Sequence, residues 1–248
     1  MEEIYNKLIN GIKYYCETTN CNGFVLGVSG GKDSTVVAKL LVDALGKDKV
    51  FGVLMPNGVQ KDISDSYKVC HLLDIDYQEV DIHYMYRELL QAIHNDCTQL
   101  DTAITMNHNT YSITEKAKTN ILPRLRMTVL YAIAQSRGFR VCGTGNLSEH
   151  YIGWFTKWGD GACDFNPIAH LTCTEVMELG HYMGLPNELV YKEPADGLTE
   201  KSDEDNFGFT YKELDEYLKD SSGVPTPNVD IFEKMHKNSQ HKTLVYEL

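Results

Sequence analysis

The stretch VLGVSGGKDSTVVAKLL, residues 25–41, decides the fold of this chain. Its first residues, 25–28, form a short apolar run that is typical of a buried strand. From Val36 onward, apolar residues recur at helical spacing until Gly46. The two glycines between the runs mark a tight turn. The stretch therefore predicts a strand, a glycine turn and a helix in direct succession.

The turn is not a Walker phosphate loop with one altered residue. The Walker pattern needs a glycine five positions before its Gly-Lys pair and a Ser or Thr after the lysine. Leu26 and Asp33 occupy those two places. Gly30 and Gly31 instead let the backbone approach a ligand closely, and the free N–H groups of the first helical turn point into the loop. This arrangement predicts a different kind of anion site.

Asp33 is the residue of the loop that needs a cation. Its carboxylate would repel a bare phosphate, so we interpret Asp33 as a Mg²⁺ ligand between protein and phosphate. The alternative is that SGGKDS is a tight turn with an ordinary helix cap, since Ser and Asp are common caps.

The composition limits the possible functions. The chain has 248 residues, 42% of them hydrophobic, which suits one large domain. Its formal net charge of −12 argues against nucleic acid as a bulk partner. Neither a signal peptide nor a run near the ~20 apolar residues of a membrane span is present in the sequence. Seven cysteines without a CxxC pair indicate reduced thiols. We therefore expect a cytoplasmic protein that does not bind membranes.

Strands and helices alternate along the chain. This order predicts an α/β fold with a doubly wound parallel sheet flanked by helices. Ligands of such sheets bind beyond the carboxyl ends of the strands, which is where the glycine loop begins. Strand-like runs lie near 24–28, 50–55, 76–82 and 139–143, and helical patterns lie near 34–45, 62–73 and 84–95.

The second half of the chain carries helix signals and two long polar stretches. Capping boxes predict helix starts at Ser112 with Glu115, Thr172 with Glu175 and Thr210 with Glu213. Residues 144–167 are expected to form a long functional loop, and the acidic run 199–208 a solvated loop.

Two arginines of the helix predicted to start at Ser112 face different directions. Arg124 and Arg126 lie about 200° apart around a regular helix, so they cannot easily bind one ligand from one chain. Either a dimer contact or two separate sites would follow.

Several motifs occur together and in a fixed order. They are SGGKDS (29–34), NILPRLRM (120–127), GTGNLSE (143–149), GWFTKWGDGACDFNPIAHLT (153–172), YKEPADGL (191–198) and HK (241–242). With them the chain resembles the ammonia-dependent NAD synthetases, which belong to the N-type ATP pyrophosphatases. The resemblance implies an adenine nucleotide alpha hydrolase-like fold. It also implies one synthetase domain over residues 1–248, with a C-terminal helical segment from about residue 172.

The resemblance also implies the chemistry. The carboxylate of deamido-NAD attacks the α-phosphorus of ATP, pyrophosphate leaves, and ammonia then displaces AMP from the acyl adenylate to give NAD. AMP makes the poorly reactive carboxylate a substrate with a good leaving group. Free ammonia, or a separate donor protein, is the expected nitrogen source, because 248 residues filled by the synthetase leave no room for an amidase domain. A homodimer is expected as well.

Residue roles follow from matching positions in the motifs. Asp33 and Glu149 are the expected Mg²⁺ ligands and, with Lys157, the expected catalytic residues. The expected ATP-binding residues are Gly27, Val28, Ser29, Gly30, Gly31, Lys32, Asp33, Ser34 and Thr144. The residues expected to bind deamido-NAD are Arg124, Lys157, Asp164, His241 and Lys242. Taken singly, such lysines and histidines are more often solvated surface residues.

Two positions depart from the family pattern. Cys173 stands where the family usually has a lysine that contacts ATP phosphate, and Ala195 stands where Ser or Thr is usual. The missing lysine removes a charge-assisted bond worth about 1.5 to 3 kcal/mol. ATP binding would weaken roughly tenfold to hundredfold unless a neighbour such as Lys192 compensates.

Two other functions compete with this interpretation. One is another adenylating enzyme of the same loop class, such as a tRNA thiolation enzyme or the synthetase half of GMP synthetase. Thiolation enzymes would show paired catalytic cysteines and a basic surface, which this acidic chain lacks. The other is a nucleotide sensor without catalysis, suggested by Cys173 and Ala195.

Overall fold

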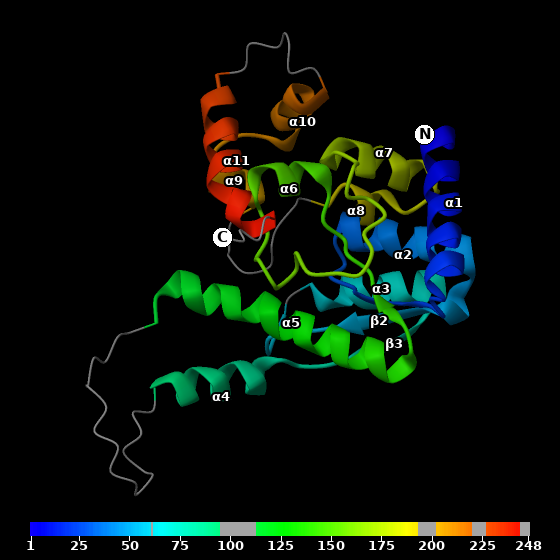
Figure 1. Cartoon of the computed structure of the whole chain (residues 1–248), viewed down its shortest axis with the longest axis horizontal. Coiled ribbons are helices and arrows are strands. Elements are labelled where there is room, and N and C mark those ends of the chain that lie inside the picture. Colours follow the sequence, from blue (N-terminus) through cyan, green and yellow to red (C-terminus); the bar gives the residue numbers. More distant parts are fainter. Residues whose placement is uncertain (61, 95–112, 193–201, 220–226, 244–248) are drawn as a thin grey trace, which may run out of the picture.

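The computed structural model describes residues 1–60, 62–94, 113–192, 202–219 and 227–243 (Figure 1). Four strands form a parallel sheet in the order β3-β2-β1-β4. From β1 the chain moves outward through β2 to β3 and then returns to the other side of β1 as β4. Such a reversal is the point where doubly wound sheets bind their ligands. The strands are β1 (Phe24–Gly27), β2 (Val50–Leu54), β3 (Asp76–Glu79) and β4 (Arg140–Val141).

Helices cover both faces of this sheet, as expected (Figure 1). The helices are α1 (Glu2–Thr19), α2 (Lys32–Leu45), the 3₁₀ turn η1 (Lys47–Lys49), α3 (Ile63–Leu73), α4 (His83–His94), α5 (Glu115–Arg137), α6 (Leu147–Ile152), α7 (Cys173–Tyr182), α8 (Asn187–Val190), α9 (Asp203–Phe207), α10 (Tyr211–Lys219) and α11 (Val229–Thr243). Within the described ranges, each helix is too short or too polar to traverse a lipid bilayer.

Alternation along β1 assigns its side chains to two separate cores. Phe24 and Leu26 are fully buried in the larger core, to which α1, α2, α3, α7 and α8 contribute. Val25 points the other way and packs in the core formed with α5. Successive side chains of a strand point to opposite faces, so a strand covered by helices on both sides is apolar throughout.

A third, smaller core holds the C-terminal helices together. It joins α6 to α10 and α11 through buried residues, and partly buried Phe207 of α9 packs against it. Its buried members are Ile152, Phe209, Leu214 and Phe232.

Three expectations about local structure are wrong. The cap of α5 is Thr114, whose side chain accepts a hydrogen bond from the N–H of Ala117 at 3.2 Å, and Ser112 lies outside the described residues. The stretch 144–167 is not one continuous loop, because α6 forms inside it. The acidic run is not simply a solvated loop, since part of it forms α9. Acidic side chains at a helix start are stabilised by the helix dipole, and Asp203 is buried against the hydroxyl of Tyr211.

The other two capping boxes are confirmed. Thr172 and Glu175 bond reciprocally at the start of α7, with both side chains accepting from backbone N–H groups. Thr210 and Glu213 do the same at the start of α10.

Candidate active site

The glycine loop joins β1 to α2, as the sequence predicts. Gly31 is the N-cap of α2 and supplies no side chain, so the first N–H groups of the helix have no side-chain cap. Gly30 has φ +76°, a backbone conformation that favours glycine. A Cβ there would lie 2.8 Å from the Cβ of Asp65 and from the backbone nitrogen of Ser66. Glycine at position 30 therefore lets the loop pass against the start of α3.

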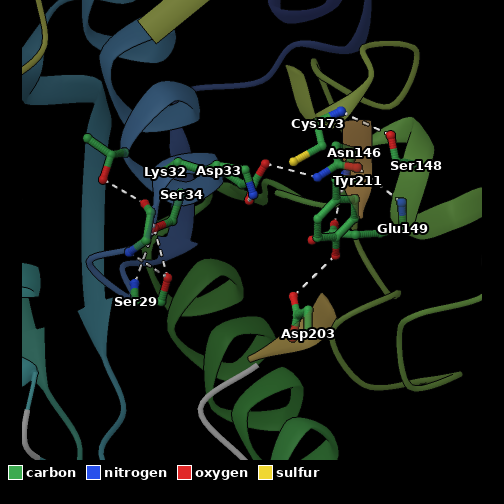
Figure 2. A network of polar contacts seen from close by, with 12 residues as sticks. Ser29, Lys32, Asp33, Ser34, Asn146, Ser148, Glu149, Cys173, Asp203 and Tyr211 are labelled. Carbon is green, nitrogen blue, oxygen red and sulfur yellow. Dashed lines mark hydrogen bonds and ion pairs between the residues drawn. The ribbon is translucent and has the colours of Figure 1, made fainter. Parts of the chain in front are cut away.

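Two serines hold the shape of this loop (Figure 2). The hydroxyls of Ser29 and Ser34 lie 3.0 Å apart. The N–H of Gly31 donates to Ser29 Oγ at 3.2 Å, and Ser34 Oγ donates to the carbonyl of Gly31 at 3.2 Å. The loop is thus preorganised by its own hydroxyls. These groups and the uncapped helix start provide hydrogen-bond donors for an anion.

Asn146 connects the two carboxylates that the sequence singled out. Its Nδ2 donates to Asp33 Oδ1 at 3.1 Å, and its backbone N–H donates to Glu149 Oε2 at 3.0 Å. Its Oδ1 accepts from the N–H of Glu149 at 3.0 Å, which makes Asn146 the N-cap of α6. Lys32 Nζ donates to the other Asp33 oxygen, Oδ2, at 2.8 Å. Asp33 is therefore held from both sides, and Asn146 ties α6 to α2.

The charges of this cluster perturb each other strongly. Burial and the nearby Asp33 carboxylate raise the pKa of Glu149 to about 8, against the opposing effects of Lys32 and the Asn146 N–H. Burial lowers the pKa of Lys32, but the combined effects of Asp33, Cys173 and Glu149 outweigh burial, so the net pKa is raised. Lys32 therefore remains an ammonium. Two close carboxylates that resist joint ionisation form a site with an electrostatic demand for a further cation.

The donor set is suited to Mg²⁺. Magnesium binds through one or two carboxylates and takes its remaining ligands from water and substrate phosphates. Asp33 and Glu149 could supply the two carboxylates. In the part of the chain that the structure describes, no group of three His, Cys, Asp or Glu side chains could hold a metal by itself. A metal here would thus depend on ligand oxygens.

A second set of buried polar residues surrounds this cluster (Figure 2). The ring of Tyr211, from α10, lies 5.5 Å from Lys32 Nζ, and its hydroxyl donates to Asp203 of α9 at 3.2 Å. The N–H of Cys173 donates to Ser148 Oγ at 3.0 Å. The first pair places α9 and α10 beside the start of α2, and the second joins α7 to α6.

Sequence reasoning missed these surrounding residues for a physical reason. Asn146 with Glu149 fits the capping pattern, so the spacing could have revealed it. No local pattern relates Tyr211 or Asp203 to Lys32, because tertiary packing alone brings α9 and α10 to α2.

Three residues expected to bind deamido-NAD come together, namely Arg124, Lys157 and His241. Arg124 Nε donates to the carbonyl of Lys157 at 3.2 Å, and Lys157 Nζ donates to the carbonyl of His241. Arg126 points elsewhere and donates to the carbonyl of Met55 at 3.1 Å, just beyond β2. The expected divergence of the two arginines is confirmed, and within one chain they reach two separate places.

Lys242 and Asp164 have backbone partners in this structure. Lys242 Nζ donates to the carbonyls of Gly153 and Phe155, each at 2.6 Å, at the C-terminal end of α6. Asp164 Oδ2 accepts from the N–H of Val141 in β4 at 2.8 Å. Both contacts support the local fold.

Thr144 and Lys192 occupy different positions relative to the glycine loop. Thr144 lies just after β4, at the carboxyl edge of the sheet, and β4 pairs with β1. Lys192 Nζ donates to Asp62 and Asp65 at 2.9 Å each, at the start of α3. Lys192 is thus bound to α3, and Ala195 lies outside the described residues.

Known proteins match this chain over nearly its whole length. A family model described as NAD synthase matches residues 4–245. The NH₃-dependent NAD⁺ synthetase of Carboxydothermus hydrogenoformans is 38% identical over 249 residues, covering 100% of this chain and 97% of the relative. That of Thermococcus sibiricus is 36% identical over 254 residues, covering 97% and 94%. The chain belongs to the NAD synthase family.

Solved structures of similar proteins have the same fold. A structure of NMN synthetase from Francisella tularensis gives a TM-score of 0.86 at 33% identity, covering 100% of this chain and 97% of that one. An NH₃-dependent NAD synthetase from Campylobacter jejuni gives 0.77 at 25% identity, with coverage of 100% and 97%. The expected adenine nucleotide alpha hydrolase-like fold of the NAD synthase family is confirmed.

The raised pKa of Glu149 predicts a pH effect on the metal-free protein. The folded state keeps a proton on Glu149 up to about pH 8, whereas an ordinary glutamate ionises near 4.5. This contribution to the free energy of unfolding is complete below pH 4.5 and is lost as the pH rises through about 8. Urea unfolding in EDTA should show that Glu149→Gln, which mimics the protonated acid, removes this part of the pH dependence. Equal pH dependence in both proteins would contradict the prediction.

Proposed function

We propose that this chain is an ammonia-dependent NAD synthetase, which converts deamido-NAD, ATP and ammonia to NAD, AMP and pyrophosphate. Family membership and the names of the relatives support this reaction. The observation that carries it is the link from the glycine loop through Asp33 and Asn146 to Glu149. This link joins an anion-binding helix start to a carboxylate pair suited to a cation. A nucleoside triphosphate requires both, because it binds through its phosphates together with a divalent cation.

The residues of the loop would act on the departing pyrophosphate. The N–H groups at the start of α2 and the hydroxyls of Ser29 and Ser34 would bind its oxygens. Each charge-assisted bond contributes about 1.5 to 3 kcal/mol. Because the donors are positioned before ATP binds, little reorganisation is needed as charge develops on the leaving group.

We propose Mg²⁺ as the cation and Asp33 and Glu149 as its protein ligands. When bound, Mg²⁺ would supply charge neutralisation at the phosphate oxygens. Asn146 would keep the two carboxylates in place through its bonds to both residues. Lys157 stays a proposed catalytic residue, because its position beside Arg124 and His241 puts an ammonium among the groups expected to bind the dinucleotide.

Replacing Arg124 by alanine should raise the KM for deamido-NAD about tenfold to hundredfold and change the KM for ATP much less. The loss follows from removing the guanidinium that contacts the Lys157 carbonyl beside His241. Steady-state kinetics with each substrate varied in turn would measure the ratio. Arg137→Ala is the matched control, since Arg137 lies on α5 over the ring of Phe51 at 3.8 Å. Equal changes in both KM values would remove Arg124 from the dinucleotide site.

The Francisella structure suggests a second candidate substrate to compare with deamido-NAD. That protein is an NMN synthetase, and its fold agrees with this chain at a TM-score of 0.86. The alternative is that this chain amidates the deamido mononucleotide, through the same adenylation of a carboxylate.

One assay separates these activities. The protein is incubated with MgATP, ammonium and either deamido-NAD or the deamido mononucleotide, and the amide product, AMP and pyrophosphate are measured. The proposal expects the larger kcat/KM for deamido-NAD, with one AMP per amide. A larger value for the mononucleotide would favour the alternative. Binding of the nucleotides without release of AMP would indicate a sensor, and formation of ADP and phosphate would exclude the proposed chemistry.

We propose a homodimer that associates through α4. This helix packs against α5 (Figure 1), but it exposes several large apolar side chains. These are Tyr84, Met85, Leu89 and Ile93. Leu89→Glu should therefore shift the dimer to monomer in sedimentation experiments without lowering the melting temperature of the monomer. A monomeric parent protein would contradict the proposal.

We also propose that residues 1–248 act as one synthetase domain in the cytoplasm. The span of the family match, 4–245, supports the first point. The free state of all six described cysteines supports the second.

A further inference from the structure

Cys173 and Lys32 enter the same buried space from two different helices. Cys173 is the first residue of α7 and is 1% exposed, and Lys32 is the first residue of α2. The two helices pack closely, since a Cβ at Gly180 of α7 would lie 3.0 Å from Val36 of α2. Figure 2 shows the Cys173 sulfur pointing toward Lys32 and Asp33. The sulfur is near enough to the ammonium for electrostatic interaction.

The Lys32 ammonium is enclosed by this space. Its side chain is 3% exposed, its Nζ lies 2.8 Å from Asp33 Oδ2, and the ring of Tyr211 lies 5.5 Å away. Glu149 adds a second carboxylate within electrostatic range. The ammonium is thus held against one oxygen of the Asp33 carboxylate, while Asn146 holds the other.

We propose that Lys32 and Cys173 are a matched pair: Lys32 delivers the positive charge beside Asp33, and Cys173 is the small neutral neighbour that leaves room for it. Lys32 is a positioning residue, because it acts on the phosphate site through Asp33. The inference rests on the proposed function only for the identity of the ligand as a polyphosphate.

Positions 32 and 173 are both helix starts that open into the same space. A lysine side chain is long and flexible, so an ammonium could reach this space from position 173 as well as from position 32. Two ammonium groups there would repel each other and lose hydration in a buried setting. The charge should therefore be movable between the two positions, but not tolerated at both.

The test compares Lys32→Met, Cys173→Lys and the double variant. Thermal melting and calorimetric titration with inorganic pyrophosphate and Mg²⁺ are measured for each. Lys32→Met should bind pyrophosphate about tenfold more weakly or worse. Cys173→Lys should melt about 5 °C or more below the parent, or fail to fold. The double variant should fold, melt above Cys173→Lys, and bind pyrophosphate more tightly than Lys32→Met.

Lys39 provides the matched control. It lies about two turns further along the same helix, pairs with Asp43 at 2.5 Å and has 26% of its side chain exposed. Combining Lys39→Met with Cys173→Lys should leave the protein as unstable as Cys173→Lys alone. Equal rescue by Lys39→Met would show a general charge effect and overturn the inference.

Additive effects in the double variant, or its failure to fold, would also overturn the inference, as would unchanged pyrophosphate binding by Lys32→Met. Neither melting nor pyrophosphate binding involves deamido-NAD. If the double variant recovers stability and pyrophosphate binding but the parent protein forms no NAD, the proposed function is rejected and the Lys32–Cys173 inference stands. If the parent forms NAD but the double variant shows no recovery, the inference is rejected and the proposed function stands.

Discussion

Asp33→Asn is expected to lower the rate of NAD formation about 10³-fold or more while the protein stays folded. Asparagine keeps the shape of the side chain but removes the negative charge that is placed between Lys32 and Asn146. Loss of a metal ligand at a reacting phosphate costs several kcal/mol of transition-state stabilisation, and about 4 kcal/mol corresponds to that factor. Single-turnover formation of AMP would measure the effect on the adenylation step.

Asp43→Asn is the matched control for this variant. Asp43 also lies on α2 and pairs with a lysine, Lys39, at 2.5 Å, but it accepts its other bond from the hydroxyl of Tyr5. It should retain the parent rate of AMP formation. An unchanged rate in Asp33→Asn itself would remove Asp33 from the mechanism.

Gly30→Ala is expected to reduce kcat/KM for ATP about 10²-fold and to lower the melting temperature. The methyl group would require a left-handed backbone, at about 1 to 2 kcal/mol, and would lie 2.8 Å from the Cβ of Asp65 and the nitrogen of Ser66. Because atoms of α3 near its backbone cannot move aside easily, the loop must shift. A misplacement of about 1 Å at a reacting site can cost 10²-fold in rate. Kinetics and thermal melting of the same preparation would test both effects.

Gly184→Ala separates backbone strain from the clash. Gly184 has φ +72°, close to the +76° of Gly30, but no atom lies within 4 Å of a Cβ added there. It should therefore show the strain alone, with a small loss of melting temperature and normal kinetics. If Gly30→Ala behaved like Gly184→Ala, the contact with α3 would not shape the glycine loop.

Much of the fold could be predicted because its signals are local. The apolar strand before SGGKDS, the helical spacing after it and the two glycines report short-range backbone and burial preferences, and β1, the loop and α2 follow them. The reciprocal caps at Thr172 and Thr210 are also local, since each involves residues three positions apart. Local patterns fail where two candidates compete, as when Thr114 rather than Ser112 caps α5.

The sequence by itself determined the glycine loop, the parallel alternation of strands and helices, and the candidate residues Asp33 and Glu149. Only the tertiary structure decided how they meet. The bond from Asn146 to Asp33 spans 113 residues, and Tyr211 reaches Lys32 through the docking of α10. Such contacts depend on the packing of several helices at once. The buried Asp203 shows the same principle, because a partner from another helix turns an apparently solvated acid into part of the site.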